Sequence, residues 1–532
     1  MEKNLYLGIE FGSTRIKSVL IDDTCEPVAI GGHNWENRLT GGVWTYTLDD
    51  IWQGVQASYA AMAADYQARH NAKLTKITGM GVSAMMHGYI PLDATGELLT
   101  EFRTWRNTST EAASKTLTPL FGINIPLRWS IAHLYQAILN GEDHLPRLTT
   151  ITSLAGYVHY KLTGENVLGT GDASGVFPID SATGEYHKGN LADFDKLIAD
   201  KNFGWKVADI LPKVLPAGAV AGQLTANGAK LLDPTGTLAP GANFCPPEGD
   251  AGTGMVATNS VAASTGNVSA GTSIFAMLVL EKGLSRLHPE IDMVTTPCGK
   301  PVAMVHCNNG TSDLNAWVGL LHEAATMISG TSADINHVYE SLYRAALTGD
   351  ADGGGLMAVS YLSGEHNTGF EEGRPLFMRL PEGRLTVPNF MRTLLLTSMA
   401  TLKLGMDILT VEEGVKITQL MGHGGIFNTK GVAQKLMAGA LNIPVSVMET
   451  ANEGGAWGIA LLAAYMGQTA VSQTANPSPS MTLGEFLDKH VFSGRAGATI
   501  APDSADTQGF EAFMKGFAAG LKVERAAVDN YK

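Results

Sequence analysis

The sequence opens with a strand–turn–strand pattern that recurs half a chain later. Residues 5–10 have the alternation of a β-strand, Gly12-Ser13-Thr14 interrupts it, and residues 16–22 resume it. Residues 268–273 lead through a second Gly/Thr/Ser turn into an apolar strand over residues 274–280. A repeated unit at this separation predicts two related domains that face each other.

Between these hairpins the periodicity of the apolar side chains alternates between helix and strand. Apolar residues recur at helical spacing from Ile51 to Met62, after Thr47 or Asp49 as a plausible N-cap. Residues 77–83 are typical of a buried strand and residues 89–93 of a further one. Strands and helices mixed in this order predict an α/β fold.

Near the C-terminus the sequence predicts two loops and one helix. Residues 475–482 and 495–507 are rich in turn-forming residues and predict exposed loops. Residues 510–528 place apolar side chains on one helical face, so this closing helix should pack on a domain.

Composition limits the partners of the chain. With 37 Lys and Arg against 51 Asp and Glu, the formal net charge is −14, and such an acidic surface repels nucleic acids and anionic lipids. We therefore expect neither nucleic-acid nor membrane partners. The 61 glycines exceed the usual share of ~7% and indicate many tight backbone turns.

The cysteine pattern and the N-terminus indicate the compartment. Four cysteines without a CxxC spacing are typical of a reduced protein rather than of a disulfide framework or a zinc site. The N-terminus lacks the features of a signal peptide. The longest apolar run, residues 457–466, is shorter than the ~18 residues that a membrane span needs. We expect a cytoplasmic protein.

The first candidate site is the turn Gly12-Ser13-Thr14 with Lys17 close by. Backbone N–H groups at a glycine turn, two hydroxyls and an ammonium group form a good phosphate cradle. The same residues are also ordinary hairpin chemistry, which on its own is the commoner outcome. No GxxxxGK[ST] string occurs, so this is not a Walker A loop.

The second candidate is Asp250, which lies among glycines in the segment PEGDAGTG. A carboxylate on such an approachable backbone could act as the general base for a hydroxyl nucleophile. A helix N-cap is an equally good interpretation.

The third candidate is the loop that contains Gly424, Gly425 and Asn428, which precedes a helical pattern over residues 432–441. Such a loop allows close backbone approach to a flat ligand such as adenine. A plain strand-to-helix connection explains it equally well.

The fourth candidate combines Met86-His87-Gly88 with Trp105-Arg106-Asn107. A His and an Asn or Arg near an aromatic face could bind a polyhydroxylated substrate through directional hydrogen bonds. A buried His that is satisfied by the backbone is the more common outcome.

In their order and spacing these motifs resemble the FGGY carbohydrate kinases, and most closely their xylulokinase-like branch. The similarity runs from residue 5 to about residue 465. It rests on the segments GIEFGSTRIK (8–17), SAMMHG (83–88), DASG (172–175), GD (249–250), AGTS (270–273), YLSGE (361–365), GG (424–425) and EGGAWG (453–458).

The resemblance implies an α/β fold of two actin-like, ribonuclease-H-like domains around a central nucleotide and sugar cleft. Residues 1–255 would form the sugar-side domain and residues 256–532 the ATP-side domain. The C-terminal helix could pack back on the first domain. The partners would be a small sugar and ATP, and a homodimer is possible.

The resemblance also implies a role for each candidate residue in ATP-dependent phosphorylation of a sugar hydroxyl. Asp250 would be the catalytic base and a substrate contact. Glu10 would organise the phosphates with Mg²⁺. Substrate contacts would come from Met86, His87, Trp105 and Asn107, and ATP contacts from Gly12, Ser13, Thr14, Lys17, Gly271, Thr272, Gly424, Gly425 and Asn428.

The sequence departs from the family pattern at several of these positions. Glu10 stands where the family usually has Asp, and Ala251 where it often has Asn. Asn107 and Ser109 replace an Asp and an Arg, so a charged sugar contact is missing or comes from elsewhere. The substrate expected is a ketopentose such as xylulose or a related sugar or polyol. A non-catalytic sugar or nucleotide sensor and an actin-like ATPase are the alternatives.

Overall fold

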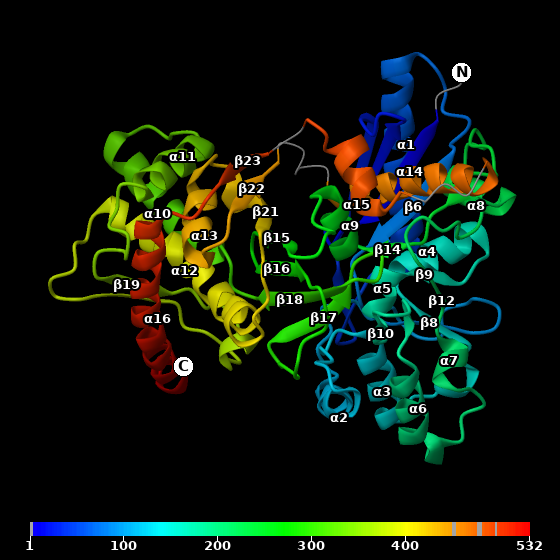
Figure 1. Cartoon of the computed structure of the whole chain (residues 1–532), viewed down its shortest axis with the longest axis horizontal. Helices are drawn as coiled ribbons and strands as arrows, with labels where there is room; N and C mark the ends of the chain where they lie inside the picture. Colours follow the sequence, from blue (N-terminus) through cyan, green and yellow to red (C-terminus); the bar gives the residue numbers. More distant parts are fainter. Residues whose placement is uncertain (1–3, 449–453, 476–480, 495–496) are drawn as a thin grey trace.

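The computed structural model describes residues 4–448, 454–475, 481–494 and 497–532. Two α/β domains lie side by side, the first on the right of Figure 1 and the second on the left. Each domain is built on one larger β-sheet.

The first sheet begins with the predicted hairpin. Strands β1 (Leu5–Phe11) and β2 (Arg15–Asp22) pair antiparallel around the Gly12–Thr14 turn, and β3 (Pro27–Asn34) continues the sheet. On the other side β6 (Gly79–Ala84) pairs parallel with β1. The short strands β13 (Asn243–Phe244) and β14 (Glu248–Gly249) pair with β6.

The second sheet repeats this arrangement. Strands β15 (Thr265–Ala270) and β16 (Ile274–Val279) form an antiparallel hairpin, β18 (Pro301–Cys307) pairs with β16, and β21 (Gln419–His423) pairs parallel with β15. The order β3-β2-β1-β6 thus matches β18-β16-β15-β21. The predicted duplication is confirmed in the topology of the two sheets. The sheet is completed by β17 (Ile291–Thr295), β22 (Val445–Val447) and β23 (Ala498–Ile500).

Helices cover both faces of the first sheet. Helix α1 (Leu48–His70) begins after Thr47, whose side chain and that of Asp50 cap each other's backbone, as the sequence predicted for Thr47. Helix α14 (Gly454–Ala475) covers the opposite face and packs on β1 and β6. Gly8 permits this contact, because a Cβ at residue 8 would collide with the carbonyl oxygen of Ala456.

This placement of α14 divides the chain differently from a cut at residue 255. Although α14 lies in the second half of the sequence, its side chains join the core of the first domain. The chain therefore returns to the first domain late in the sequence, and two contiguous segments do not describe the packing.

The expectation that the C-terminal helix could pack back on the first domain is wrong. Helix α16 (Ser504–Asn530) contains the predicted helix, and it packs on α12 (Val387–Asp407), α13 (Val432–Leu441) and β19 (Leu356–Val359) of the second domain. The apolar face that carries Phe510, Phe513 and Phe517 is buried in that core. The ion pair between Arg392 and Asp506 fixes its first turn there.

Of the two predicted C-terminal loops, one falls largely outside the described residues, which omit 476–480. The prediction of a loop over residues 495–507 is wrong where it meets β23 and the start of α16. Strand β23 forms because it completes the sheet edge beside β22, where the hydroxyls of Ser446 and Thr499 lie 2.6 Å apart.

One helical segment, Val387–Glu412, is long and apolar enough to cross a membrane by length and composition alone. It comprises α12 and the π-helical turn η4 (Ile408–Glu412), and 67% of its most apolar window is buried inside the protein. A core helix of a folded domain passes the same test.

The remaining elements connect and cover the two sheets. In the first half they are β4 (Arg38–Thr40), β5 (Val43–Thr45), β7 (Ile90–Leu92), α2 (Glu111–Phe121), α3 (Ser130–Asn140), η1 (Leu145–Arg147), β8 (Thr150–Thr152), α4 (Leu154–Thr163), β9 (Val167–Gly169), α5 (Thr170–Ser174), β10 (Ile179–Asp180), β11 (Glu185–Tyr186), α6 (Lys188–Leu197), η2 (Ala199–Lys201), α7 (Val207–Ile210), β12 (Lys213–Leu215), α8 (Ala226–Leu232) and α9 (Asp250–Ala257). In the second half they are α10 (Ser312–Ser329), α11 (Ile335–Ala346), η3 (His366–Thr368), β20 (Leu376–Arg379), η5 (Gly425–Phe427), α15 (Leu483–Phe486) and η6 (Leu487–Val491).

Candidate active site

Asp250 is the first residue of α9, and Gly249 is the N-cap. The alternative of an N-cap Asp is therefore wrong. The Oδ1 atom of Asp250 accepts hydrogen bonds from the backbone N–H of Met86 at 3.1 Å and of Ala251 at 2.9 Å. Burial raises the pKa of Asp250, whereas these two N–H groups and the charge of Arg128 act against the rise. The carboxylate is thus positioned at the backbone of the loop after β6 (residues 85–88, the predicted sugar loop) and is a stronger base than an exposed Asp.

His87 lies in the loop after β6 with a backbone φ of 72°, and its ring is buried. The ring stacks on Trp129 with a centroid distance of 6.0 Å, and Nδ1 lies 3.3 Å from the carbonyl oxygen of Gly175. Because that carbonyl only accepts, Nδ1 carries the proton and Nε2 is an acceptor. Burial and the charge of Arg128 lower the pKa of His87 to about 3, so the ring is neutral.

Met86 joins this group through backbone and side chain. Its N–H binds Asp250, and its side chain lies directly against the backbone of Gly249, where a Cβ would collide with Met86 Cγ. The predicted residues Met86, His87 and Asp250 are therefore brought together.

The other two predicted substrate contacts have different positions. The Asn107 side chain binds the backbone of Trp44 through both its amide groups, with Oδ1 accepting at 2.9 Å and Nδ2 donating at 2.8 Å, and Nδ2 also donates to Thr104. This is a structural role. The Trp105 side chain is 38% exposed beside it. The arrangement does not support the prediction that these two residues bind substrate.

Glu10 lies at the end of β1, opposite Lys17 of β2 and Ser83 of β6. The first turn of α14 reaches it, with Ala456 N–H donating to Oε2 at 3.2 Å. Burial, followed by the negative charge of Asp250, raises the pKa of Glu10 to about 7, although Lys17 and the nearby amides lower it. Glu10 and Asp250 are therefore two carboxylates close enough to repel each other.

This pair fits the donor chemistry of Mg²⁺. The described residues contain no group of three or more His, Cys, Asp and Glu side chains that could hold a metal by itself. Mg²⁺ is usually bound by one or two carboxylates together with substrate phosphates. A cation near Glu10 would also relieve its repulsion with Asp250.

Two further buried acids, Glu248 and Asp172, lie near Asp250, and no sequence motif predicted a role for either. Glu248 accepts from the N–H of Asp172 at 2.9 Å and of Gly171 at 3.3 Å, and Ser153 donates to Asp172. Burial, and then the negative charge of Asp250, raises the pKa of Asp172 to about 7. Burial, and then the negative charge of Asp172, raises the pKa of Glu248 to about 8. In the sequence, the run Glu248-Gly249-Asp250 places a second acid two residues before Asp250, and this spacing could have identified Glu248.

The first predicted phosphate turn is held by its carbonyl groups. The Gly12 carbonyl accepts from Trp35 Nε1 and the Ser13 carbonyl from the Tyr46 hydroxyl, each at 2.7 Å, and the two aromatic rings stack with centroids 3.9 Å apart. Ser13 and Thr14 are exposed. The turn therefore has a rigid support and an accessible tip.

The second predicted phosphate turn lies beside the Gly424 loop at one end of the second sheet. Strands β15 and β21 are parallel, with Ser269 opposite His423, so Gly271 and Gly424 follow at the same edge. Gly424 has φ 101°, and a Cβ there would collide with the carbonyl oxygen of Ala270. The Gly271 carbonyl accepts from the backbone and side chain of Thr311 at 2.9 Å. Thr272 is exposed at this edge.

A cavity of about 470 Å³ opens next to this edge. Gly425 and Asn428 line it together with Thr311, Tyr339 and Arg344. Its place beside the second phosphate turn is where the adenosine side of a nucleotide was expected. Of the predicted ATP contacts in the second domain, Gly425 and Asn428 therefore line this cavity, whereas Gly271, Thr272 and Gly424 are not among its lining residues.

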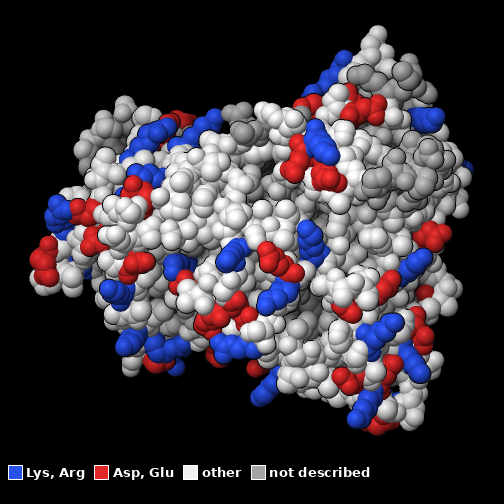
Figure 2. Space-filling view, in the orientation of Figure 1, with Lys and Arg blue, Asp and Glu red and all other residues white. Residues whose placement is uncertain are grey.

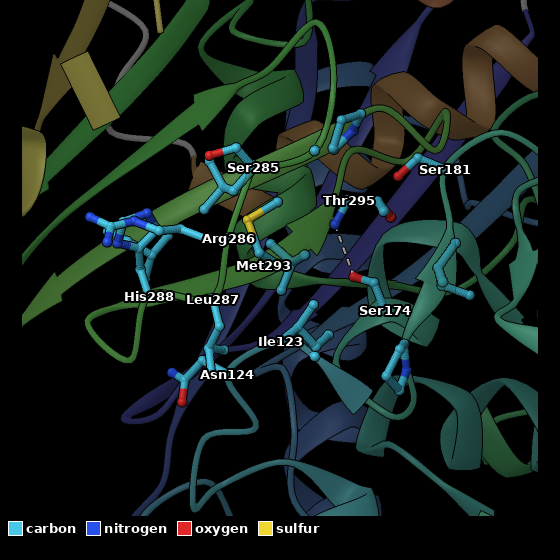
Figure 3. Close-up of a pocket in the computed structure, with 18 residues that line it drawn as sticks. Ile123, Asn124, Ser174, Ser181, Ser285, Arg286, Leu287, His288, Met293 and Thr295 are labelled. Atoms are coloured by element: carbon cyan, nitrogen blue, oxygen red, sulfur yellow. Dashed lines mark hydrogen bonds between the residues drawn. The ribbon is translucent and has the colours of Figure 1, made fainter. Parts of the chain in front are cut away.

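The two domains meet where β17 contacts α5. Thr295 donates its N–H to Ser174 Oγ at 3.0 Å (Figure 3). Its hydroxyl donates to the Thr170 carbonyl at 3.0 Å. A pocket of about 270 Å³ beside this contact is lined by Ile123 and Asn124 of the first domain and by residues 283–288, 291 and 293–295 of the second. Figure 2 shows acidic and basic side chains interspersed over the outer face that spans both domains.

Known proteins match most of this chain. Residues 5–237 match the N-terminal domain and residues 266–467 the C-terminal domain of the FGGY family of carbohydrate kinases. A xylulose kinase from Haemophilus influenzae is 22% identical over 433 residues, which cover 79% of this chain and 83% of that protein.

Solved structures share the fold. A xyloylose kinase from Brucella ovis superimposes with a TM-score of 0.75 at 21% identity, covering 98% of this chain and 100% of that one. A gluconate kinase from Lactobacillus acidophilus gives 0.77 at 17% identity, covering 100% and 99%. The predicted α/β fold with two actin-like domains is confirmed. The chain belongs to the FGGY family of carbohydrate kinases and is a sugar kinase, a phosphotransferase with an alcohol group as acceptor.

Proposed function

We propose that this chain transfers the γ-phosphoryl group of ATP to a hydroxyl group of a ketopentose such as xylulose. The name of the Haemophilus influenzae relative supports the sugar. The observation that carries the proposal is the 3.1 Å hydrogen bond from Met86 N–H to Asp250 Oδ1, because it joins the sugar loop to the base.

The sugar would lie against Met86 and His87, with the neutral His87 ring accepting a substrate hydroxyl at Nε2. Asp250 would take the proton from the hydroxyl that attacks. Its raised pKa makes the carboxylate a better proton acceptor, and the N–H groups of Met86 and Ala251 keep it oriented. A positioned base of this kind contributes a factor of ~10²–10⁴ to the rate.

The nucleotide would lie against the second domain. The cavity beside Gly425 and Asn428 would take the adenosine, and the turns at Gly12 and Gly271 would meet the phosphates with N–H and hydroxyl groups. Mg²⁺ bound with the nucleotide would neutralise phosphate charge, and Glu10 would help to hold it. Most of the rate enhancement would come from positioning and charge neutralisation rather than from covalent chemistry.

Sugar-dependent ADP release across a panel of ketoses, aldoses and polyols tests this function. We expect strong stimulation by xylulose or a closely related ketopentose. ADP release that no sugar stimulates would contradict the proposal and favour a sensor or an ATPase. Stimulation by glycerol or gluconate alone would keep the kinase but contradict the ketopentose.

A further inference from the structure

We propose that the ion pair between Arg128 and Asp292 makes the sugar pocket selective for uncharged sugars and polyols and excludes sugar acids. This inference rests on the proposed function and deepens it by naming the substrate class. It also identifies where the chain carries charge near the sugar loop, given that Asn107 and Ser109 replace the charged residues of the family pattern.

Arg128 lies outside the sugar loop in the sequence and is hydrogen-bonded to it through its backbone. Its carbonyl accepts the N–H of Gly88 at 3.0 Å, and the next residue, Trp129, stacks on the ring of His87. The hydroxyl of Ser130 donates to the Gly88 carbonyl at 2.5 Å. Three consecutive residues therefore hold His87 and Gly88, and the first of them carries a guanidinium group. That side chain is 21% exposed and thus accessible to a small ligand.

The partner of Arg128 comes from the other domain. Asp292 lies on β17 and is 7% exposed, and one of its carboxylate oxygens pairs with the Arg128 guanidinium. The other oxygen accepts from Asn124 Nδ2 at 2.8 Å. Both oxygens of Asp292 therefore have hydrogen-bond partners. Its negative charge compensates the positive charge of Arg128 where β17 packs on α5.

The nearby histidines add no positive charge. His306 on β18 stacks with His366 of η3 at a centroid distance of 6.3 Å. Burial and the charge of Arg128 lower the pKa of His306 to about 3, as they do for His87. The pKa of His366 is lowered chiefly by burial as well. These rings are neutral at physiological pH and offer directional hydrogen bonds to hydroxyl groups.

The charge balance of this region therefore disfavours an anion. The positive charge of Arg128 is compensated by Asp292, and Asp250 adds a negative charge close by. A carboxylate that entered the pocket would lose its hydration without gaining an unpaired cation, which is costly. A hydroxyl group loses much less and can bind His87. Neutral polyols are thus favoured over the acids of the same carbon skeleton.

Asp292→Asn tests this inference, because it keeps the shape of the side chain and leaves the Arg128 charge uncompensated. We would measure binding by calorimetry and ADP release for xylulose and for xylonate, the five-carbon sugar acid. We expect the wild-type protein to bind xylulose at least ~10-fold more tightly than xylonate. In Asp292→Asn the ratio should shift toward xylonate by at least 10-fold. In the double variant Arg128→Gln/Asp292→Asn this shift should disappear.

Asp506→Asn is the matched control, since it removes the carboxylate partner of Arg392 in the core of the second domain, away from the sugar loop. It should lower the melting temperature without changing the xylulose-to-xylonate ratio. An unchanged ratio in Asp292→Asn, or wild-type binding of xylonate as tight as that of xylulose, would overturn the inference. Absence of sugar turnover in the wild-type protein contradicts the proposed function instead, and the binding ratio still decides the charge argument.

Discussion

The ionisation of Glu10 should make the free energy of unfolding of the protein fall as the pH rises. The pKa of Glu10 is raised from 4.5 to about 7 by burial and by the charge of Asp250. Below pH 4.5 the group is protonated in both the folded and the unfolded states, so it costs nothing. Between pH 4.5 and 7 only the unfolded state loses the proton, and stability declines. Above pH 7 the full penalty applies, which is about 3 kcal/mol at 1.36 kcal/mol for each pKa unit.

Glu10→Gln removes this charge and keeps the length of the side chain, and its amide oxygen can still accept from Ala456 N–H. We therefore expect the variant to be more stable than the wild-type protein at pH 8, by about 3 kcal/mol, and equally stable at pH 4.5. With 2–4 °C per kcal/mol for a domain of this size, the melting temperature should rise by ~6–12 °C at pH 8. Activity should fall, because strained charges at active sites are retained for function.

Thermal unfolding of both proteins between pH 4.5 and 8.5, without nucleotide, measures this effect. Glu511→Gln, on an exposed position of α16, serves as the control and should follow the wild-type curve at every pH. The proposed destabilisation by ionised Glu10 is refuted if Glu10→Gln is less stable than the wild-type protein at pH 8. It is also refuted if the difference in stability between the two proteins does not depend on pH.

Four other substitutions test the architecture and the assigned roles. Gly8→Ala should destabilise the protein by at least ~2 kcal/mol, because the new methyl group collides with the α14 backbone. The control Gly319→Ala in α10, where a Cβ meets nothing within 4 Å, should stabilise the protein by ~0.5–1 kcal/mol. Equal melting temperatures for the two variants would contradict the packing of α14 on Gly8. Gly424→Ala forces a side chain into a left-handed backbone against Ala270. The KM for ATP should therefore rise at least ~10-fold, with little change in the KM for sugar. In initial-rate kinetics, a rise in the KM for sugar without a rise in the KM for ATP would place this loop on the sugar side. Asn107→Ala should lower stability by ~1–3 kcal/mol and leave the KM for sugar within about twofold; a large rise in that KM without a change in the melting temperature would restore Asn107 as a substrate contact.

The sequence was most informative where function depends on local backbone geometry. The turns at Gly12 and Gly271 are short-range features, and the alternating strand before the first turn and the continuous apolar strand after the second made each hairpin predictable. Asp250 was identified for a similar reason, since a carboxylate between glycines is unusual within a single segment. Its N-cap alternative failed only by one position, because Gly249 takes the cap.

Features that depend on distant partners could not be predicted. Arg128 and Asp292 are 164 residues apart, and neither lies in a motif, so the sequence contains no signal for their pairing. Asn107 matched a family position, but its amide is used by the Trp44 backbone, 63 residues earlier. The packing sites of α14 and α16 likewise depend on contacts with elements that lie far away in the sequence.

The role of Asp250 as the base of this sugar kinase can be tested with Asp250→Asn. The kcat for sugar-dependent ADP release should fall by ~10²–10⁴-fold, while the Kd for ATP, measured by calorimetry on the same preparation, should stay within about threefold of the wild-type value. The variant should retain the wild-type fold by circular dichroism, because Asn can accept the same hydrogen bonds from Met86 and Ala251. An Asp250→Asn protein that phosphorylates the sugar at a near wild-type rate would show that Asp250 is not the base.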